Sequence, residues 1–190
     1  MKVLLADDNE DRSAAVLRRL SESGISQVVR LAAGQRLVDV VEAEKPDVVI
    51  VDMSRPDRDS LENIRQVSAQ APRPIVLFVD RDDAGFMEEA IEAGVSSYNL
   101  MGSSVPDVKP IVQTAVAIFR RYQKLADTLE KAETRLNERE IVQRAKARLM
   151  KERRLTEPQA HSHLRKTAMN RGKRMVEIAV ELLSSSEKKS

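Results

Sequence analysis

The stretch Val48-Val49-Ile50-Val51-Asp52 places four apolar β-branched residues in a row and ends them with a carboxylate. A continuous apolar run of this kind is typical of a strand that is buried on both faces, as in a parallel sheet covered by helices. Residues 2–6 and 74–79 form similar runs, and residues 27–31 and 97–100 are further strand candidates. The sequence therefore predicts five strands.

Apolar residues at helical spacing separate these strands and predict helices over residues 11–21, 35–44, 60–69 and 84–93. Pro46 ends the second helix, because the residue before a proline avoids the α region. Strands that alternate with helices in this way form a parallel sheet with helices on both faces. We therefore expect an α/β domain over residues 1–120.

Three acidic side chains follow two of the strands: Asp7 and Asp8 come after the first, and Asp52 ends the third. The carboxyl ends of parallel strands meet at one edge of the sheet, where such domains have their functional crevice. Clustered carboxylates repel one another unless a hard cation such as Mg²⁺ neutralises them through oxygen ligands, and a carboxylate beside Mg²⁺ can accept a phosphoryl group. We predict a Mg²⁺ site here. The alternative is that each acid only solvates a loop or caps a helix.

A long connecting helix is expected over residues 106–136, with Pro106 in its first turn, where proline is tolerated. Apolar residues recur along it at alternating spacings of four and three, which defines a heptad seam. The seam predicts either a coiled-coil dimer interface or a face packed on the chain's own domain. We favour self-association, because so long a helix would project beyond a domain of this size. The seam residues are Ile118, Tyr122, Leu125, Leu129, Ala132 and Leu136.

Residues 137–184 are predicted to form a module of three helices, followed by a polar tail at residues 185–190. Thr156, with Gln159 three residues later, forms a capping-box pattern for the second helix. Gly172 separates the second helix from the third, because glycine readily ends a helix.

Charge divides the chain, although the net charge is only +2. Residues 1–120 contain 14 Lys and Arg against 20 Asp and Glu, whereas residues 121–190 contain 18 against 10. Basic clusters on a compact helical scaffold bind phosphate backbones, and solvated helix faces are the alternative explanation. The predicted nucleic-acid contacts are Arg144, Lys146, Arg148, Lys151, Arg165, Lys166, Arg171, Lys173 and Arg174.

Several classes of protein are disfavoured by composition. The chain has no cysteine, so disulfides and thiolate metal sites are excluded. No apolar run approaches the roughly 20 residues of a membrane span, and Asp7 comes too early for a signal peptide. We expect a cytoplasmic protein with no membrane partner. A metal-dependent phosphatase is the weaker alternative, since no general base accompanies the acids, and no enzymatic activity is expected.

The order Asp7-Asp8, then Asp52, then Pro56 and Asp57 resembles the receiver domain of bacterial response regulators. The resemblance covers residues 1–120. It implies a flavodoxin-like fold, Mg²⁺ bound by the three acids that follow the strands, and phosphorylation of Asp52.

Two positions depart from the receiver pattern. Receivers usually end the fourth strand with Thr or Ser and the fifth with Lys-Pro, and here Val79 and Met101-Gly102 stand at those places. Valine cannot donate a hydrogen bond and methionine has no charge. These departures favour control by a bound partner protein over a response to phosphate.

Three stretches of the tail form a second recognisable pattern: RAKARLM at 144–150, LTEPQA at 155–160 and LRKTAM at 164–169. In these stretches the tail resembles the ANTAR domain of the AmiR/NasR family. The resemblance implies an RNA-binding antiterminator that binds hairpins in leader mRNA and prevents terminator formation. Ala147 and Arg154 stand where the family usually has glycine, and His161 where it usually has an aromatic residue.

Two further stretches are PDRDSLE at 56–62 and AGVSSY at 93–98. With them, the chain is similar over its whole length to NasT-type regulators of nitrate assimilation. This closer similarity implies a NasS-like partner protein that senses nitrate or nitrite, as an alternative to a histidine kinase, and we expect a homodimer in the active state. A DNA-binding response regulator controlled by phosphorylation is the rival reading. The first helix of the tail is too long and continuous for the recognition-helix arrangement that such a protein needs.

Overall fold

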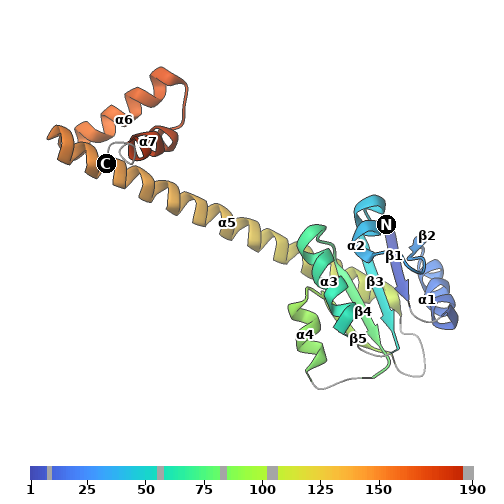
Figure 1. The fold of residues 1–190 in the computed structure, drawn as a ribbon. Helices are drawn as coiled ribbons and strands as arrows, with labels where there is room; N and C mark the ends of the chain where they lie inside the picture. The colour runs from blue at the N-terminus through green and yellow to red at the C-terminus, as the bar shows by residue number, and fades with distance from the viewer. Residues whose placement is uncertain (8–9, 55–57, 82–84, 102–106, 186–190) are drawn as a thin grey trace. The chain divides into compact units, whose positions relative to one another are not determined.

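The computed structural model describes residues 1–7, 10–54, 58–81, 85–101 and 107–185 (Figure 1). The chain forms two compact units, Met1–Gln123 and Lys124–Ser190. We refer to them as the first unit and the helical unit. No helix in the described ranges is both long enough and apolar enough to cross a membrane.

The first unit contains a five-stranded sheet in the order β2-β1-β3-β4-β5, and all neighbouring strands are parallel. Every residue of β3 and β4 is buried, as the continuous apolar runs predicted. The five predicted strands and their parallel pairing are thus confirmed. The strands are β1 (Lys2–Asp7), β2 (Gln27–Arg30), β3 (Val48–Met53), β4 (Ile75–Val79) and β5 (Ser97–Leu100).

Helices cover both faces of this sheet (Figure 1). One apolar core lies between the sheet and α1 (Glu10–Glu22) together with the start of α5 (Val108–Arg153). The other lies between the sheet and α2 (Leu37–Glu44), α3 (Arg58–Gln70) and α4 (Phe86–Glu92). This is the expected flavodoxin-like arrangement.

Two local features show why helices of the first unit end where they do. Lys45, directly before Pro46, adopts a left-handed conformation with φ 48° and so ends α2. Gly94, with φ 109°, follows α4 at a point where a Cβ atom would collide with the Ser68 side chain. Glycine is required there for both its backbone conformation and its small size.

Helix α5 begins later than the sequence suggested. Its first residue is Val108, whereas the predicted start, Pro106, lies outside the described residues. Pro110 falls in the first helical turn, where the missing N–H has no acceptor within the helix. From there α5 continues for 46 residues without interruption, so the connecting helix and the first helix of the tail are one element.

The helical unit packs the end of α5 against α6 (Glu157–Arg171) and α7 (Met175–Ser184). The Thr156 backbone N–H donates a hydrogen bond of 2.9 Å to Gln159 Oε1, and Gly172 ends α6 in the left-handed region, as predicted. Arg154 also adopts a left-handed conformation, with φ 52°, at the turn where the ANTAR pattern usually has glycine. The three-helix module is confirmed. Its buried core residues are Ala145, Leu149, Ala160, Leu164, Ala168, Ile178 and Ala179.

Candidate functional site

Two of the predicted acids lie side by side at the carboxyl edge of the sheet. Asp7 ends β1, and its Cα pairs with that of Asp52 in the neighbouring strand β3. Asp52 is only 2% exposed and the Asp7 side chain 5%. Both line a pocket of about 190 Å³. The topology therefore brings these two acids together, while Asp8 lies outside the described residues.

A cation from the edge strand contacts this pair. Arg30, the last residue of β2, places Nη2 2.9 Å from Asp7 Oδ2. The Ser13 hydroxyl, from α1, donates to the same oxygen. Arg30 was not among the predicted site residues, although it lies at the end of a predicted strand. One carboxylate oxygen of Asp7 is thus already engaged by a positive charge and a hydroxyl.

The donor set is suited to Mg²⁺ in its chemistry. Asp7 and Asp52 offer hard carboxylate oxygens from adjacent strand ends, which is the ligand type that Mg²⁺ takes. Within the described part of the chain, no group of three His, Cys, Asp or Glu side chains comes together. The third acid of the predicted site, Asp8, is outside the described ranges.

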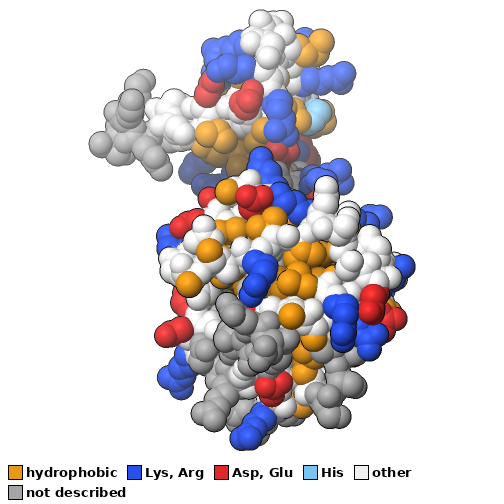
Figure 2. Space-filling model, turned by 90° about the vertical axis from the view of Figure 1, so that its right-hand side faces the viewer, with side chains coloured by type: hydrophobic (Ala, Val, Ile, Leu, Met, Phe, Trp, Pro, Cys, Tyr) orange, Lys and Arg blue, Asp and Glu red, His pale blue; other side chains and the backbone are white. Residues whose placement is uncertain are grey.

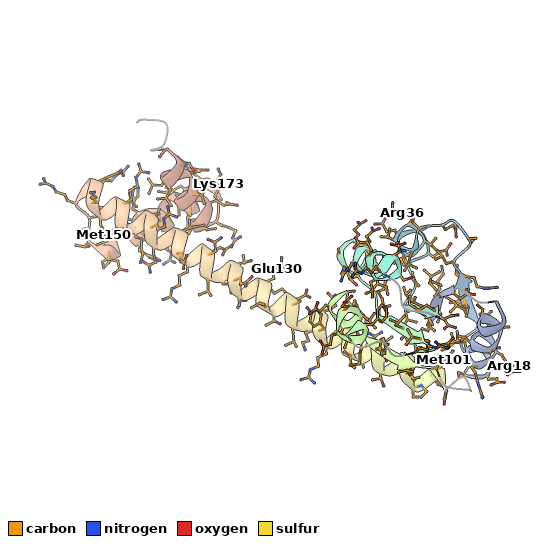
Figure 3. All side chains as sticks on the ribbon, turned by 60° about the horizontal axis from the view of Figure 1, so that its bottom comes forward. Arg18, Arg36, Met101, Glu130, Met150 and Lys173 are labelled. Atoms are coloured by element: carbon orange, nitrogen blue, oxygen red, sulfur yellow. The ribbon has the colours of Figure 1, made fainter. Side chains whose placement is uncertain are left out.

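The ends of β4 and β5 carry hydrocarbon and a thioether in place of a hydroxyl and an ammonium group. Val79 ends β4 and is fully buried. Met101 follows β5, is 6% exposed, and packs in the core with Val108 and Val112 (labelled Met101 in Figure 3). The Met101 backbone N–H donates a hydrogen bond of 2.7 Å to the Val79 carbonyl oxygen. Val79 and Met101 thus lie at the ends of the fourth and fifth strands, the positions at which the sequence departs from the receiver pattern.

Two of the predicted basic contacts hold the helical unit together. Lys146 is only 7% exposed, and its Nζ lies 2.7 Å from Glu157 Oε1. This hydrogen bond and the charge of the ammonium group lower the pKa of the Glu157 carboxyl. Arg148 donates from Nη1 to the Leu182 carbonyl oxygen at 2.5 Å and so caps the end of α7. Neither side chain is a freely exposed cation, which the sequence pattern could not show.

The other predicted basic contacts are exposed but differ in their pairing. Arg171 and Lys173 both pair with Glu181, and the hydrogen bond from Lys173 lowers the pKa of that carboxyl. Arg174 pairs with Glu138 at 2.6 Å. Lys and Arg side chains spread over the visible surface of the helical unit (Figure 2). Those that form no ion pair with another described residue are Arg144, Lys151, Arg165 and Lys166.

The heptad seam is exposed in the single chain. Ile118, Tyr122, Leu125, Leu129 and Leu136 are between 52% and 68% exposed, and Ala132 is also exposed. Glu130, labelled in Figure 3, lies in this part of α5. The apolar stripe exists as predicted, and self-association through it stays a prediction.

Comparison with known proteins identifies both units. The response regulator receiver domain matches residues 3–99, and the ANTAR domain matches residues 130–183. The chain is a response regulator with a receiver domain and an ANTAR domain. Both family resemblances are therefore confirmed.

This response regulator is similar over nearly its whole length to the transcriptional regulatory protein PdtaR of Mycobacterium tuberculosis. The two are 30% identical over 187 residues, which are 97% of this chain and 91% of PdtaR. The comparisons support the family but not the nitrate-assimilation assignment, which stays a prediction.

Solved receiver structures share the fold of the first unit. The BeF3-activated receiver domain of Klebsiella pneumoniae RstA is 24% identical, with a TM-score of 0.51, and the match covers 62% of this response regulator and 98% of that chain. The receiver domain of a modulated diguanylate cyclase from Desulfovibrio desulfuricans G20 is 19% identical, with a TM-score of 0.52, and the match covers 64% of this chain and 98% of that one.

Proposed function

We propose that this response regulator controls transcription by binding hairpins in leader mRNA through its ANTAR domain, which prevents terminator formation. The observation that carries the proposal is that four of the predicted nucleic-acid contacts are exposed and form no ion pair with another described residue: Arg144, Lys151, Arg165 and Lys166. Exposed cations on a compact scaffold bind phosphate backbones. The rival, DNA binding, needs a recognition helix within a tri-helical or winged arrangement, and the first helix of this unit, the end of the continuous 46-residue α5, is too long for that arrangement.

The proposed input to the receiver domain is a bound partner protein that responds to nitrate or nitrite. Val79 and Met101 support partner control, because neither can contact a phosphoryl group through a hydroxyl or an ammonium group. The nitrate signal is supported only by the similarity of residues 56–62 and 93–98 to NasT-type regulators. Phosphorylation of Asp52 by a histidine kinase is the competing input.

Binding of a two-hairpin leader RNA and of the matching duplex DNA tests the function. We expect RNA to bind more tightly, with an affinity that falls as salt rises. Arg165→Gln combined with Lys166→Gln should make the negative slope of log affinity against log salt shallower by about 2, since each phosphate contact contributes about 1 to its magnitude. Lys109→Gln in the receiver domain is the control and should leave the slope unchanged. Tighter binding to the DNA would refute the RNA proposal.

A second arm of this experiment separates the two inputs. Acetyl phosphate and Mg²⁺ are added before the RNA titration, and phosphorylation of Asp52 is followed by mass. Under partner control we expect unchanged RNA affinity. A phosphorylated protein that binds RNA much more tightly would show that phosphate is the input.

We further propose that Asp7, Asp8 and Asp52 bind Mg²⁺ and that Arg30 competes with the metal for Asp7. Arg30→Gln should tighten Mg²⁺ binding about fivefold, because a partly exposed ion pair contributes up to about 1 kcal/mol. Arg36→Gln is the matched control, since Arg36 is an exposed arginine of the same unit whose ion-pair partner is Asp39. Isothermal titration with Mg²⁺ measures the difference. Equal Mg²⁺ affinities of the two variants would exclude Arg30 as a competitor.

A further inference from the structure

A pocket of about 410 Å³ opens on the helical unit between α5, the side of α6 and the first turn of α7. Residues from one face of α5 form one wall, including Arg135, Arg139 and Gln143. His161 of α6 and Met175 of α7 line the other side. None of these five was among the predicted nucleic-acid contacts, because the prediction followed clusters of charge along the chain and the pocket joins separate segments.

Two of the cations that line this pocket form no ion pair with another described residue. Arg174 and Lys146 also line it, and both form ion pairs with glutamates, as described above. Arg135 and Arg139 are exposed, and neither makes an ion pair with any residue in the described ranges. The pocket therefore favours a ligand with negative charge.

The remaining lining is not that of a simple phosphate site. Val142, Met175 and Val176 form an apolar part of the wall. Gln143 offers an amide with both donors and an acceptor, and His161 adds an imidazole. A planar base fits such a wall, because its face contacts apolar atoms and arginine guanidinium planes while its edge needs hydrogen-bond partners. A duplex backbone would instead contact an open, charged surface.

We propose that this pocket receives one unpaired nucleotide from the loop of an RNA hairpin. Arg135 and Arg139 bind its phosphate groups, and Gln143 and His161 contact the edge of its base. The inference deepens the proposed function and rests on it: exposed cations outside the pocket supply affinity for the stem, and the pocket supplies preference for a particular loop.

The pocket is tested by combining single protein variants with single abasic sites in the RNA. The RNA series is one hairpin in which each loop nucleotide is replaced in turn by an abasic one. We expect one lesion to weaken binding to the unmodified protein by about tenfold, which is the loss of one or two hydrogen bonds. Gln143→Ala should show the same loss with the intact RNA and no further loss with that lesion. Arg139→Gln should weaken intact RNA similarly.

Arg165→Gln is the matched control for charge, because Arg165 is an exposed arginine of the same unit outside the pocket. This variant should retain full sensitivity to the critical lesion. Equal binding of the intact hairpin by Gln143→Ala and the unmodified protein would overturn the pocket assignment, and so would additive effects of Gln143→Ala and every lesion. A protein that binds no hairpin at all would instead refute the proposed function, so the two failures are distinguishable.

Discussion

Replacing Leu149 by alanine is expected to unfold the helical unit while the receiver domain stays folded. Leu149 is fully buried in the core between α5, α6 and α7. Removal of a buried leucine side chain costs about 2–5 kcal/mol, from lost burial and the cavity left behind. A unit this small has a total stability of only about 3–5 kcal/mol. The loss of one side chain is therefore comparable to the whole free energy of unfolding of the unit.

Thermal unfolding of the full-length protein, followed by circular dichroism, measures this effect. We expect the transition of the helical unit to fall below room temperature and that of the receiver domain to stay in place. Met150→Ala is the control at the next position, because Met150 is 39% exposed and its loss should cost no more than about 0.5 kcal/mol. RNA binding should disappear with Leu149→Ala and persist with Met150→Ala. Unchanged melting of the Leu149→Ala protein would contradict the packing described for this core.

The sequence predicted best those features whose residues recur at a regular spacing or mark the start or end of a helix or strand. The apolar run before Asp52 was enough to identify a strand buried on both faces, because such a strand contacts hydrocarbon on each side. Thr156 and Gln159 marked the start of α6, since the capping interaction spans only three residues. In both cases the deciding interactions lie within one element, so their spacing is visible along the chain.

Interactions between distant elements were not predictable in this way. Arg30 reaches Asp7 only because β2 lies beside β1, and Lys146 reaches Glu157 only after the chain turns back at Arg154. The sequence does not distinguish a basic residue that faces solvent from one that forms an ion pair between two helices. For this reason the sequence could count the cations of the tail but could not separate those that bind glutamates from those available to RNA.

The exposed seam on α5 is the proposed dimer interface. Replacing Leu129 by lysine is expected to abolish the proposed dimer and to weaken binding of a two-hairpin RNA about a hundredfold. In a coiled coil the side chain at a central seam position contacts its counterpart in the second chain, so the variant would bring two ammonium groups together in a desolvated interface. Two linked ANTAR domains on two linked hairpins gain affinity of about 10²–10⁴ from effective concentration, and a monomer loses that gain.

The number of hairpins in the RNA separates this explanation from damage to the ANTAR domain itself. Leu129→Lys should bind a single hairpin as tightly as the unmodified protein does, because the loss comes from linkage between two sites rather than from either site. Thr128→Lys adds the same charge one residue away, at an exposed position off the seam, and should retain the dimer. Light scattering during size-exclusion chromatography, with and without RNA, reports the oligomeric state. If Leu129→Lys and Thr128→Lys bind the two-hairpin RNA equally, the seam does not link the two RNA sites.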